Sequence, residues 1–514
     1  MRPAHPTRSR PSSPEVLLLL LLASIAGGVL AQEAARAPES VSSMGAQEVA
    51  TLALQVAPIV EEIRGAKFKS PVPVKVVGDA AAQEHFNSRI KKFYSPQQLL
   101  ADQTAYVQLG LLPPSTDMVG AVMKVMEEQA GGFYDPGSGI FYVLGDMPRS
   151  IAPAIVAHEL THALDDQRFD IDGMLERAGG DNDRLSAAAS VIEGSGTVVM
   201  TAYVLRQMQS GAMASEDMEE LQQTEAGRAQ KLLAAPPLIQ RWLVGPYMLG
   251  QYFITHGEPG RVTAGVNGAE IDELFLRPPL STEQVIHPEK YWDASRRDLP
   301  RAVALPDLSA LLGEGWSRSG TGTLGEMLLA ELTAASPLNA IAPEAAMGTA
   351  WTNEAASGWD GDAWSVYSSG DRTVTVLATV WDSDKDATEF KAALPGSGGR
   401  QAAAIRNAAC VVAGDAGERR AALLEACLAA AGSPVEAAPA PGPAASRPPS
   451  QAAPAPAPSP APGRKEDCPQ PSPEVVCIQL YAPVRCGACV YSNECFARAA
   501  GQDVKLCQRL PEGP

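Results

Sequence analysis

One segment of the chain, residues 434–462, cannot belong to a compact fold. It holds eleven prolines among alanine, serine and glycine, and almost no large apolar side chain. This composition predicts a semi-stiff polyproline-type spacer, spanning roughly 90 Å if fully extended at about 3.1 Å per residue. A chain of 514 residues is also too long for one hydrophobic core. We therefore expect separate folding units on the two sides of a linker at residues 433–466.

Residues 1–31 have the pattern of a secretory signal. Three arginines precede an apolar stretch that opens at Val16, and small residues around Ala31 suit cleavage. The apolar run is short for a membrane span and two glycines interrupt it. We expect a secreted, periplasmic or cell-surface protein with no stable membrane span after signal cleavage. An uncleaved anchor is the alternative.

The formal net charge of the chain is −18. A protein built to hold nucleic acid needs a basic face, so we expect no nucleic-acid partner.

All eight cysteines lie after residue 409, and six of them fall within the last 47 residues. An even number of cysteines in an exported chain favours disulfides and a small stapled module at residues 467–514. A cysteine-rich zinc site is the competing interpretation of this tail. Cys410 and Cys427 are close enough in sequence for a separate disulfide between a strand and a helix.

Hydrophobic periodicity predicts many helices and a few strands. Helices are expected at residues 47–64, 80–92, 96–109, 116–129, 151–169, 183–209, 219–234, 238–256 and 421–430. Strands are expected at 71–77 and 373–381, and a hairpin at 132–134 and 140–144. Ser150 is the expected N-cap of the helix at 151–169. The pattern predicts an α+β fold, with a mainly helical core at 32–300 that has a small sheet or hairpin beside the helix at 151–169, an α+β extension at 301–432 and the disulfide-rich module.

The sequence His158-Glu159-Leu160-Thr161-His162 lies inside one of these helices. Residues four apart share a helix face, so the two imidazoles can bind one zinc ion. Glu159 lies where it can take a proton from a water activated by the metal, without binding the metal itself. Since the chain has only six histidines, this spacing around a glutamate is improbable by chance.

A third protein ligand is needed to complete a catalytic zinc site. Glu193 interrupts an apolar helical run and is followed by Gly194 and Gly196. A buried carboxylate is costly unless it meets a cation, and the glycines make sense if another helix packs very close. A glutamate at a helix end, with the glycines as its cap, is the alternative interpretation. The other acidic candidates downstream of the motif are Asp165, Asp166, Asp170, Asp172 and Glu176.

The HELTH motif, followed by Glu193 in SVIEGSG, resembles the gluzincins, the thermolysin-like class of zinc peptidases. The resemblance implies His158, His162 and Glu193 as zinc ligands, Glu159 as general base and a protein or peptide substrate. It also implies that the strand before the motif helix, at Ile140–Val143, borders the cleft and pairs with the substrate backbone. A weaker resemblance over roughly residues 45–430 is to little-characterised bacterial and archaeal surface proteins that share the motif HELTHALxDQ. We therefore expect a secreted zinc metallopeptidase.

Gluzincins also use a histidine or tyrosine to steady the oxyanion of the tetrahedral intermediate. His287 is the first candidate here, and each candidate can equally be an ordinary packed or solvent-facing residue. The other candidates are His256, Tyr247, Tyr252 and Tyr291. Asp166, one turn after His162, can orient that ligand as a supporting carboxylate. It can equally be a surface charge that pairs with Arg168 or another neighbour.

The tail from Cys477 to Cys495 resembles the centre of a Kazal-type inhibitor domain over about 30 residues. The sequences APVRCG and YSNEC carry the match, while an inserted Arg485 and an extra Cys489 depart from it. A protease or another surface protein is therefore a candidate partner of this module. Two alternatives to an active peptidase remain: an inactive metallopeptidase-like surface binding protein, and a protease inhibitor that acts through the tail.

Overall fold

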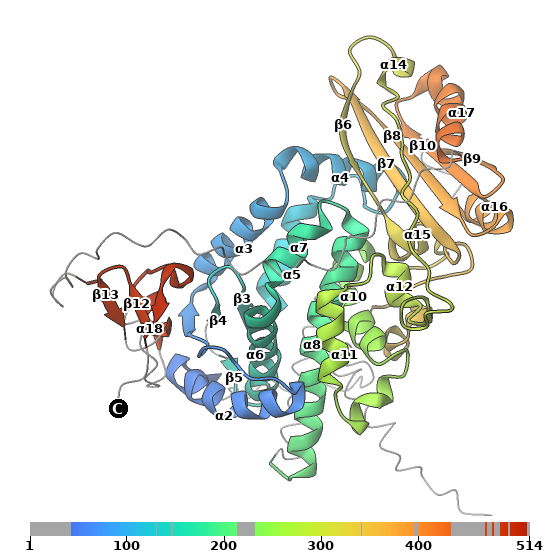
Figure 1. Ribbon diagram of the computed structural model, residues 1–514. Helices are drawn as coiled ribbons and strands as arrows, with labels where there is room; N and C mark the ends of the chain where they lie inside the picture. Colours follow the sequence, from blue (N-terminus) through green and yellow to red (C-terminus); the bar gives the residue numbers. More distant parts are fainter. Residues whose placement is uncertain are drawn as a thin grey trace, which may run out of the picture.

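The computed structural model describes residues 43–129, 131–144, 147–212, 232–340, 342–394, 399–432, 468–469, 475–476, 484–491 and 494–510. The predicted signal peptide, the linker and nearly all of the predicted helix at 219–234 lie outside these residues. Within them the predicted α+β fold is confirmed (Figure 1).

Helices dominate the first two thirds of the described chain. Their bounds are α2 Ala46–Arg64, α3 Asp79–Phe93, α4 Pro96–Leu109, α5 Met118–Gln129, α6 Ala152–Phe169, α7 Ile171–Ala178, α8 Asn182–Gln209, α10 Pro237–Ile254, α11 Gly268–Leu276, α12 Thr282–Ile286 and α13 Glu289–Trp292. Those among them that the periodicity predicts agree with it to within a few residues. A short 3-10 helix, η1, spans Pro259–Ala264.

The helix α8 is apolar around almost its whole circumference because α6 and α10 pack against it (Figure 1). Among the described residues it is also the one helix long and apolar enough to cross a bilayer, but 78% of its most apolar stretch is buried inside the protein. A helix buried in a protein core and a helix that crosses a membrane can both be apolar on all sides, and the burial of α8 agrees with the first.

The N-cap of α6 differs from the prediction. Ile151 occupies this position without a side-chain hydrogen bond, and the hydroxyl of Ser150 is buried with no partner among the described residues. Pro153 lies in the first turn and has no N–H to offer a capping hydroxyl.

A four-stranded sheet, in the order β11-β2-β4-β3, lies beside α6. Its strands are β2 Val74–Val77, β3 Gly132–Asp135, β4 Ile140–Leu144 and β11 Val475–Val476. The predicted hairpin is confirmed as β3 and β4, paired antiparallel from Gly132 opposite Val143 to Asp135 opposite Ile140. The strand β2 runs parallel to β4 on its other side. A separate small ladder joins β1 Ser43–Met44 to β5 Met147–Pro148.

The prediction that Ile140–Val143 pairs with the substrate backbone is wrong. Because β4 is hydrogen-bonded to β2 and to β3, it has no open edge. The edge strand on the side of α6 is β3, and it comes earlier in the chain.

A second, five-stranded antiparallel sheet has the order β6-β7-β8-β10-β9. Its elements and their neighbours are α14 Ser309–Leu312, β6 Ser317–Gly322, α15 Gly325–Thr333, η2 Pro343–Ala346, η3 Gly348–Ala350, β7 Trp359–Ser369, β8 Arg372–Trp381, α16 Asp384–Ala393, β9 Gln401–Ile405, β10 Ala408–Gly414, η4 Gly417–Arg419 and α17 Arg420–Ala431.

The alternating side chains of β8 show how this sheet is covered. Val374, Val376 and Ala378 pack in one cluster with α17, while Leu377 and Trp381 lie in the large core that includes α4, α8 and α10. The predicted disulfide Cys410–Cys427 joins β10 to α17. Residues 301–432 thus share a hydrophobic core with the helical region.

Besides β11, the described part of the C-terminal module contains β12 Val484–Cys486, β13 Cys489–Tyr491, α18 Glu494–Ala499, η6 Val504–Leu506 and β14 Gln508–Arg509. Two disulfides, Cys468–Cys489 and Cys486–Cys507, hold it together. With Cys410–Cys427 they make three disulfides among the described residues, which favours an oxidising compartment outside the cytosol.

Candidate metal centre

Three side chains from two neighbouring helices point at one place. His158 and His162 lie one turn apart on α6, and Glu193 comes from the middle of α8. The Nε2 atoms of the two histidines are 2.8 Å apart, and Oε2 of Glu193 lies 3.1 Å from Nε2 of His158 and 3.3 Å from Nε2 of His162. All three atoms carry lone pairs suitable for a metal.

These distances fit the donor set of a tetrahedral cation. Zinc bonds of 2.0–2.1 Å at tetrahedral angles place neighbouring ligand atoms about 3.3 Å apart. The spacing of 2.8 to 3.3 Å is therefore close to that of a bound site. The residues fit a divalent cation held by two imidazoles and one carboxylate, with a fourth position open.

Two glycines allow this convergence, as the sequence predicts. A Cβ on Gly196 would lie 2.6 Å from Cε1 of His158, and a Cβ on Gly194 would lie 2.5 Å from the carbonyl carbon of Gly250 on α10. Any larger residue would push α8 away from α6 or from α10. The interpretation of these glycines as a helix end is wrong, because α8 continues for thirteen residues after Gly196, to Gln209.

Glu159 lies beside the three ligand atoms but is held differently. Its Oε2 accepts a hydrogen bond of 2.7 Å from the backbone N–H of Tyr134 in β3. Burial and the nearby Glu193 raise the pKa of Glu159, while the two histidines and the Tyr134 N–H oppose the rise. Although Glu159 is close enough to both histidines to count as a metal ligand, this hydrogen bond turns it toward β3. Oε2 of Glu193 thus faces the two imidazole nitrogens, whereas the carboxylate of Glu159 is held by Tyr134.

The three ligand side chains are electrostatically coupled. Burial opposes charge on His162, but the carboxylate of Glu193 outweighs it and raises the pKa of His162 to about 9. Burial likewise opposes charge on Glu193, yet the two imidazoles hold its pKa well below the ordinary range. Neighbouring positive charge thus stabilises the carboxylate of Glu193 in its charged form. A metal cation bound here would supply such positive charge as well.

Tyr247 on α10 is the oxyanion candidate that the fold brings to this site. Its ring stacks on the ring of His158, with centroids 5.7 Å apart and an interplanar angle of 18°. Burial, together with the nearby carboxylates of Glu193 and Glu159, raises the pKa of its phenol well above 10. It is thus a neutral hydrogen-bond donor at neutral pH.

The fold does not bring His287 to the site. Its Nε2 lies 3.0 Å from Oε1 of Glu326, in a different cluster. The other candidates are also engaged elsewhere: His256 with Glu270 and Trp292, Tyr252 near Gly257 and Glu289, and Tyr291 with the carbonyl of Arg277.

Asp166 supports the edge strand and not His162. It accepts hydrogen bonds from the phenol of Tyr134 at 2.8 Å and from the N–H of Ile171 at 3.0 Å. Of the alternative partners, Arg168 pairs with Asp272 instead, and the neighbour that engages Asp166 is Tyr134.

The remaining acidic candidates for the third ligand have other partners. Asp170 accepts from the N–H of Gly173, and Asp172 pairs with Arg89 and Lys92. Glu176 pairs with Lys92.

Asp165 belongs to a buried network that the sequence analysis missed. It accepts from Nε of Arg64 at 3.0 Å and from the hydroxyl of Ser195 at 2.6 Å. Arg64 and Asp165 are both fully buried. This network ties the end of α2 to α6 and α8, behind His162. No local pattern in the sequence indicates it, because Arg64 and Asp165 are about a hundred residues apart.

A second acidic group, Glu283 with Asp298 and Asp382, is close enough to hold a cation. However, the ammonium of Lys290 already lies 2.6 Å from Glu283 and 2.8 Å from Asp298. The lysine supplies the positive charge there, so this group is not a candidate metal site.

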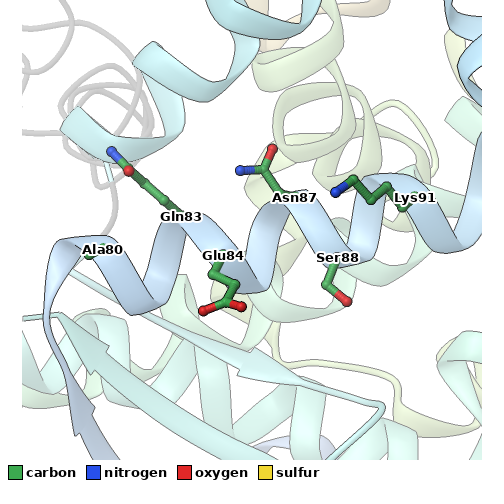
Figure 2. A pocket seen from close by; sticks show the side chains of 6 residues that line it. All are labelled: Ala80, Gln83, Glu84, Asn87, Ser88 and Lys91. Carbon is green, nitrogen blue, oxygen red and sulfur yellow. The ribbon is translucent and has the colours of Figure 1, made fainter.

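An open hollow lies along α3, away from the metal ligands. It is lined by one polar stripe of the helix, spaced three and four residues apart (Figure 2): Ala80, Gln83, Glu84, Asn87, Ser88 and Lys91. It brings together no pair of groups suited to acid–base or metal chemistry.

Comparison with known proteins adds a partial match. Residues 311–444 match the model of a family described as a domain of unknown function (DUF8575). This stretch contains the five-stranded sheet, α15, α16 and α17, and not the metal ligands. No curated protein and no solved structure matches the chain.

Proposed function

We propose that this protein is a zinc-dependent peptidase. One observation carries the proposal: Nε2 of His158, Nε2 of His162 and Oε2 of Glu193 converge to within 3.3 Å, with the carboxylate of Glu159 beside them. Two imidazoles and one carboxylate are a typical donor set of catalytic zinc.

Zinc bound to these three residues would polarise a substrate carbonyl and lower the pKa of water toward ~7. Glu159 is the group that takes the proton from the attacking water. As the water oxygen bonds to the carbonyl carbon and the C–N bond breaks, Glu159 passes this proton to the leaving nitrogen. The N–H of Tyr134 keeps the carboxylate oriented for both transfers.

Tyr247 has the position and the protonation state to stabilise the oxyanion. Its phenol is close to Glu193, so it reaches the space around the metal. Because its raised pKa keeps the proton on the phenol, Tyr247 can donate a hydrogen bond to the developing negative charge.

The edge strand β3 supports a peptide as the substrate. The N–H of Tyr134 points away from β4, toward Glu159, so the carbonyl of the same residue also faces the outer edge. An extended peptide can donate a backbone hydrogen bond to this carbonyl and lie beside Glu159. Such binding depends on the substrate backbone and selects weakly among side chains.

The three disulfides support action outside the cytosol. We propose that the mature chain is secreted, periplasmic or exposed at the cell surface.

The test is digestion of a peptide library by the purified chain supplied with zinc, compared with Glu159→Gln. We expect the wild type to cleave, and the variant to keep its zinc but lose activity by at least about 100-fold. Glu425→Gln, an exposed position on α17, is the matched control and should retain full activity. A wild type that binds zinc and cleaves nothing, or a Glu159→Gln variant that cleaves equally well, would overturn the proposal.

A further inference from the structure

The C-terminal module lies beside the sheet that contains β3 and β4 (Figure 1), and it contacts this sheet at two separate places. Val475 and Val476 add a short antiparallel strand to the edge of β2, opposite Lys75 and Val74. The second contact is at the turn of the β3–β4 hairpin. The module therefore contacts both sides of the sheet, β2 on one side and the β3–β4 hairpin on the other. A linker of about thirty residues separates it from α17.

The second contact is made by Arg498 on α18. Its Nη1 donates a hydrogen bond of 2.5 Å to the carbonyl oxygen of Ser138. The guanidinium lies so close to the turn that a Cβ on Gly139, at φ 69°, would collide with it. The positive charge of Arg498 also acts on the phenol of Tyr134 and opposes the rise in its pKa that burial and Asp166 cause.

Tyr134 connects this turn to Glu159. Its backbone N–H holds the Glu159 carboxylate at 2.7 Å, while its phenol is fixed to Asp166 at 2.8 Å. Both acceptors are on α6, two turns apart. A shift of the hairpin would therefore move the one N–H that orients Glu159.

The contact that α18 makes through Arg498 lies at the hairpin turn and not at the metal-site side chains. Among the described residues, Arg498 of α18 reaches the hairpin turn through its hydrogen bond to Ser138, whereas the side chains of His158, His162 and Glu193 contact one another and Tyr247 stacks on His158. A plug over the site would have to touch these side chains. The hydrogen bond from Arg498 instead fixes the turn of the β3–β4 hairpin.

We propose that the C-terminal module is an intramolecular brace that positions Glu159, with Arg498 as the positioning residue. The brace acts through the β3–β4 hairpin and the backbone of Tyr134. The kinetic part of this proposal rests on the proposed peptidase function, but the docking of the module does not.

The docking is tested by hydrogen exchange of the full chain, followed by mass spectrometry of peptides that cover residues 132–144. We expect Arg498→Ala to increase amide exchange there at least about 5-fold, since the hairpin loses its outer support. Arg485→Ala, an exposed position on β12, is the matched control and should leave the hairpin unchanged. Intact disulfides, measured by mass, show that the module remains folded. Equal exchange in the wild type and in Arg498→Ala would overturn the brace.

The positioning role is tested by steady-state kinetics of the same variants. Arg498→Ala should lower kcat about 10-fold with KM changed less than about twofold, because misplacing a catalytic group affects the chemical step. Zinc content should stay at the wild-type level, and Arg498→Lys should recover part of kcat. If the wild type cleaves peptides and Arg498→Ala matches its kcat, the positioning role is wrong although the peptidase stands. If exchange rises but the wild type cleaves nothing, the peptidase is wrong and the docking stands.

Discussion

Gly194 of α8 and Gly250 of α10 lie in direct backbone contact. A Cβ on Gly194 would be 2.5 Å from the carbonyl carbon of Gly250, and a Cβ on Gly250 would be 2.1 Å from the carbonyl oxygen of Ser190. This crossing places Glu193, on α8, next to Tyr247, on α10. The distance between the two helices thus sets how close Tyr247 lies to the carboxylate of Glu193.

Gly250→Ala should force these helices apart. We expect the overpacked crossing to lower the free energy of unfolding by about 1–3 kcal/mol, and zinc affinity to fall with it. Denaturant unfolding measures the first effect and zinc titration the second.

Gly260→Ala is the control, because no atom lies within 4 Å of its added Cβ. It should change the unfolding free energy by less than about 0.5 kcal/mol. Equal stability of the two variants would contradict the close crossing.

Glu193→Ala should remove the third metal ligand. Two imidazoles alone bind zinc weakly, so we expect zinc affinity to fall at least about 100-fold. Glu176→Ala, at an exposed acidic position downstream of the motif, should bind zinc like the wild type. Metal analysis after dialysis measures both. If zinc is retained in Glu193→Ala and lost in Glu176→Ala, the ligand assignment is wrong.

Arg64→Met should destabilise the protein strongly. It leaves the carboxylate of Asp165 fully buried without its positive partner, and breaking a buried pair in this way costs about 3–5 kcal/mol. The double variant Arg64→Met/Asp165→Leu removes both charges and should recover much of that loss. Denaturant unfolding compares the two. A double variant less stable than Arg64→Met would show that Asp165 contributes through some other contact.

Asp362 should make stability depend on pH. Burial raises its pKa from 3.8 to about 7, against the N–H groups of Gly325 and Leu324, and Asp181 adds to the rise. Between about pH 4 and 7 the folded state therefore holds a proton that the unfolded chain has lost, so this contribution to stability falls as pH rises.

Asp362→Asn removes this titration. Relative to the wild type, its unfolding free energy should fall less as pH rises from 4 to 7, and thermal unfolding at several pH values measures the difference. Parallel curves for the two proteins would show that Asp362 stays charged in the folded state.

The sequence predicted the parts of this site that depend on local spacing. His158 and His162 share a helix face because they are four residues apart, and Glu193 was recognisable as a carboxylate inside an apolar helix. A close helix contact at Gly194 was also one of two interpretations of the glycines there, the other being a helix cap.

What the sequence could not predict depends on contacts between distant segments. The strand β4 lost its open edge because β2, more than sixty residues earlier, pairs with it. Arg64 contacts Asp165 across the core. The hydrogen bond from Tyr134 to Glu159 is donated by the backbone N–H, so the residue type at position 134 does not indicate it. Tyr247 was one of several candidates, and only the crossing of α8 and α10 selects it over His287.

The most direct test of the metal centre is a crystal structure of the zinc-loaded protein with anomalous diffraction at the zinc edge. The account predicts one strong peak within about 2.0–2.2 Å of Nε2 of His158, Nε2 of His162 and Oε2 of Glu193, with the Glu159 carboxylate outside the coordination sphere. The absence of a peak there, or a peak bound to Glu159 in place of Glu193, would contradict it.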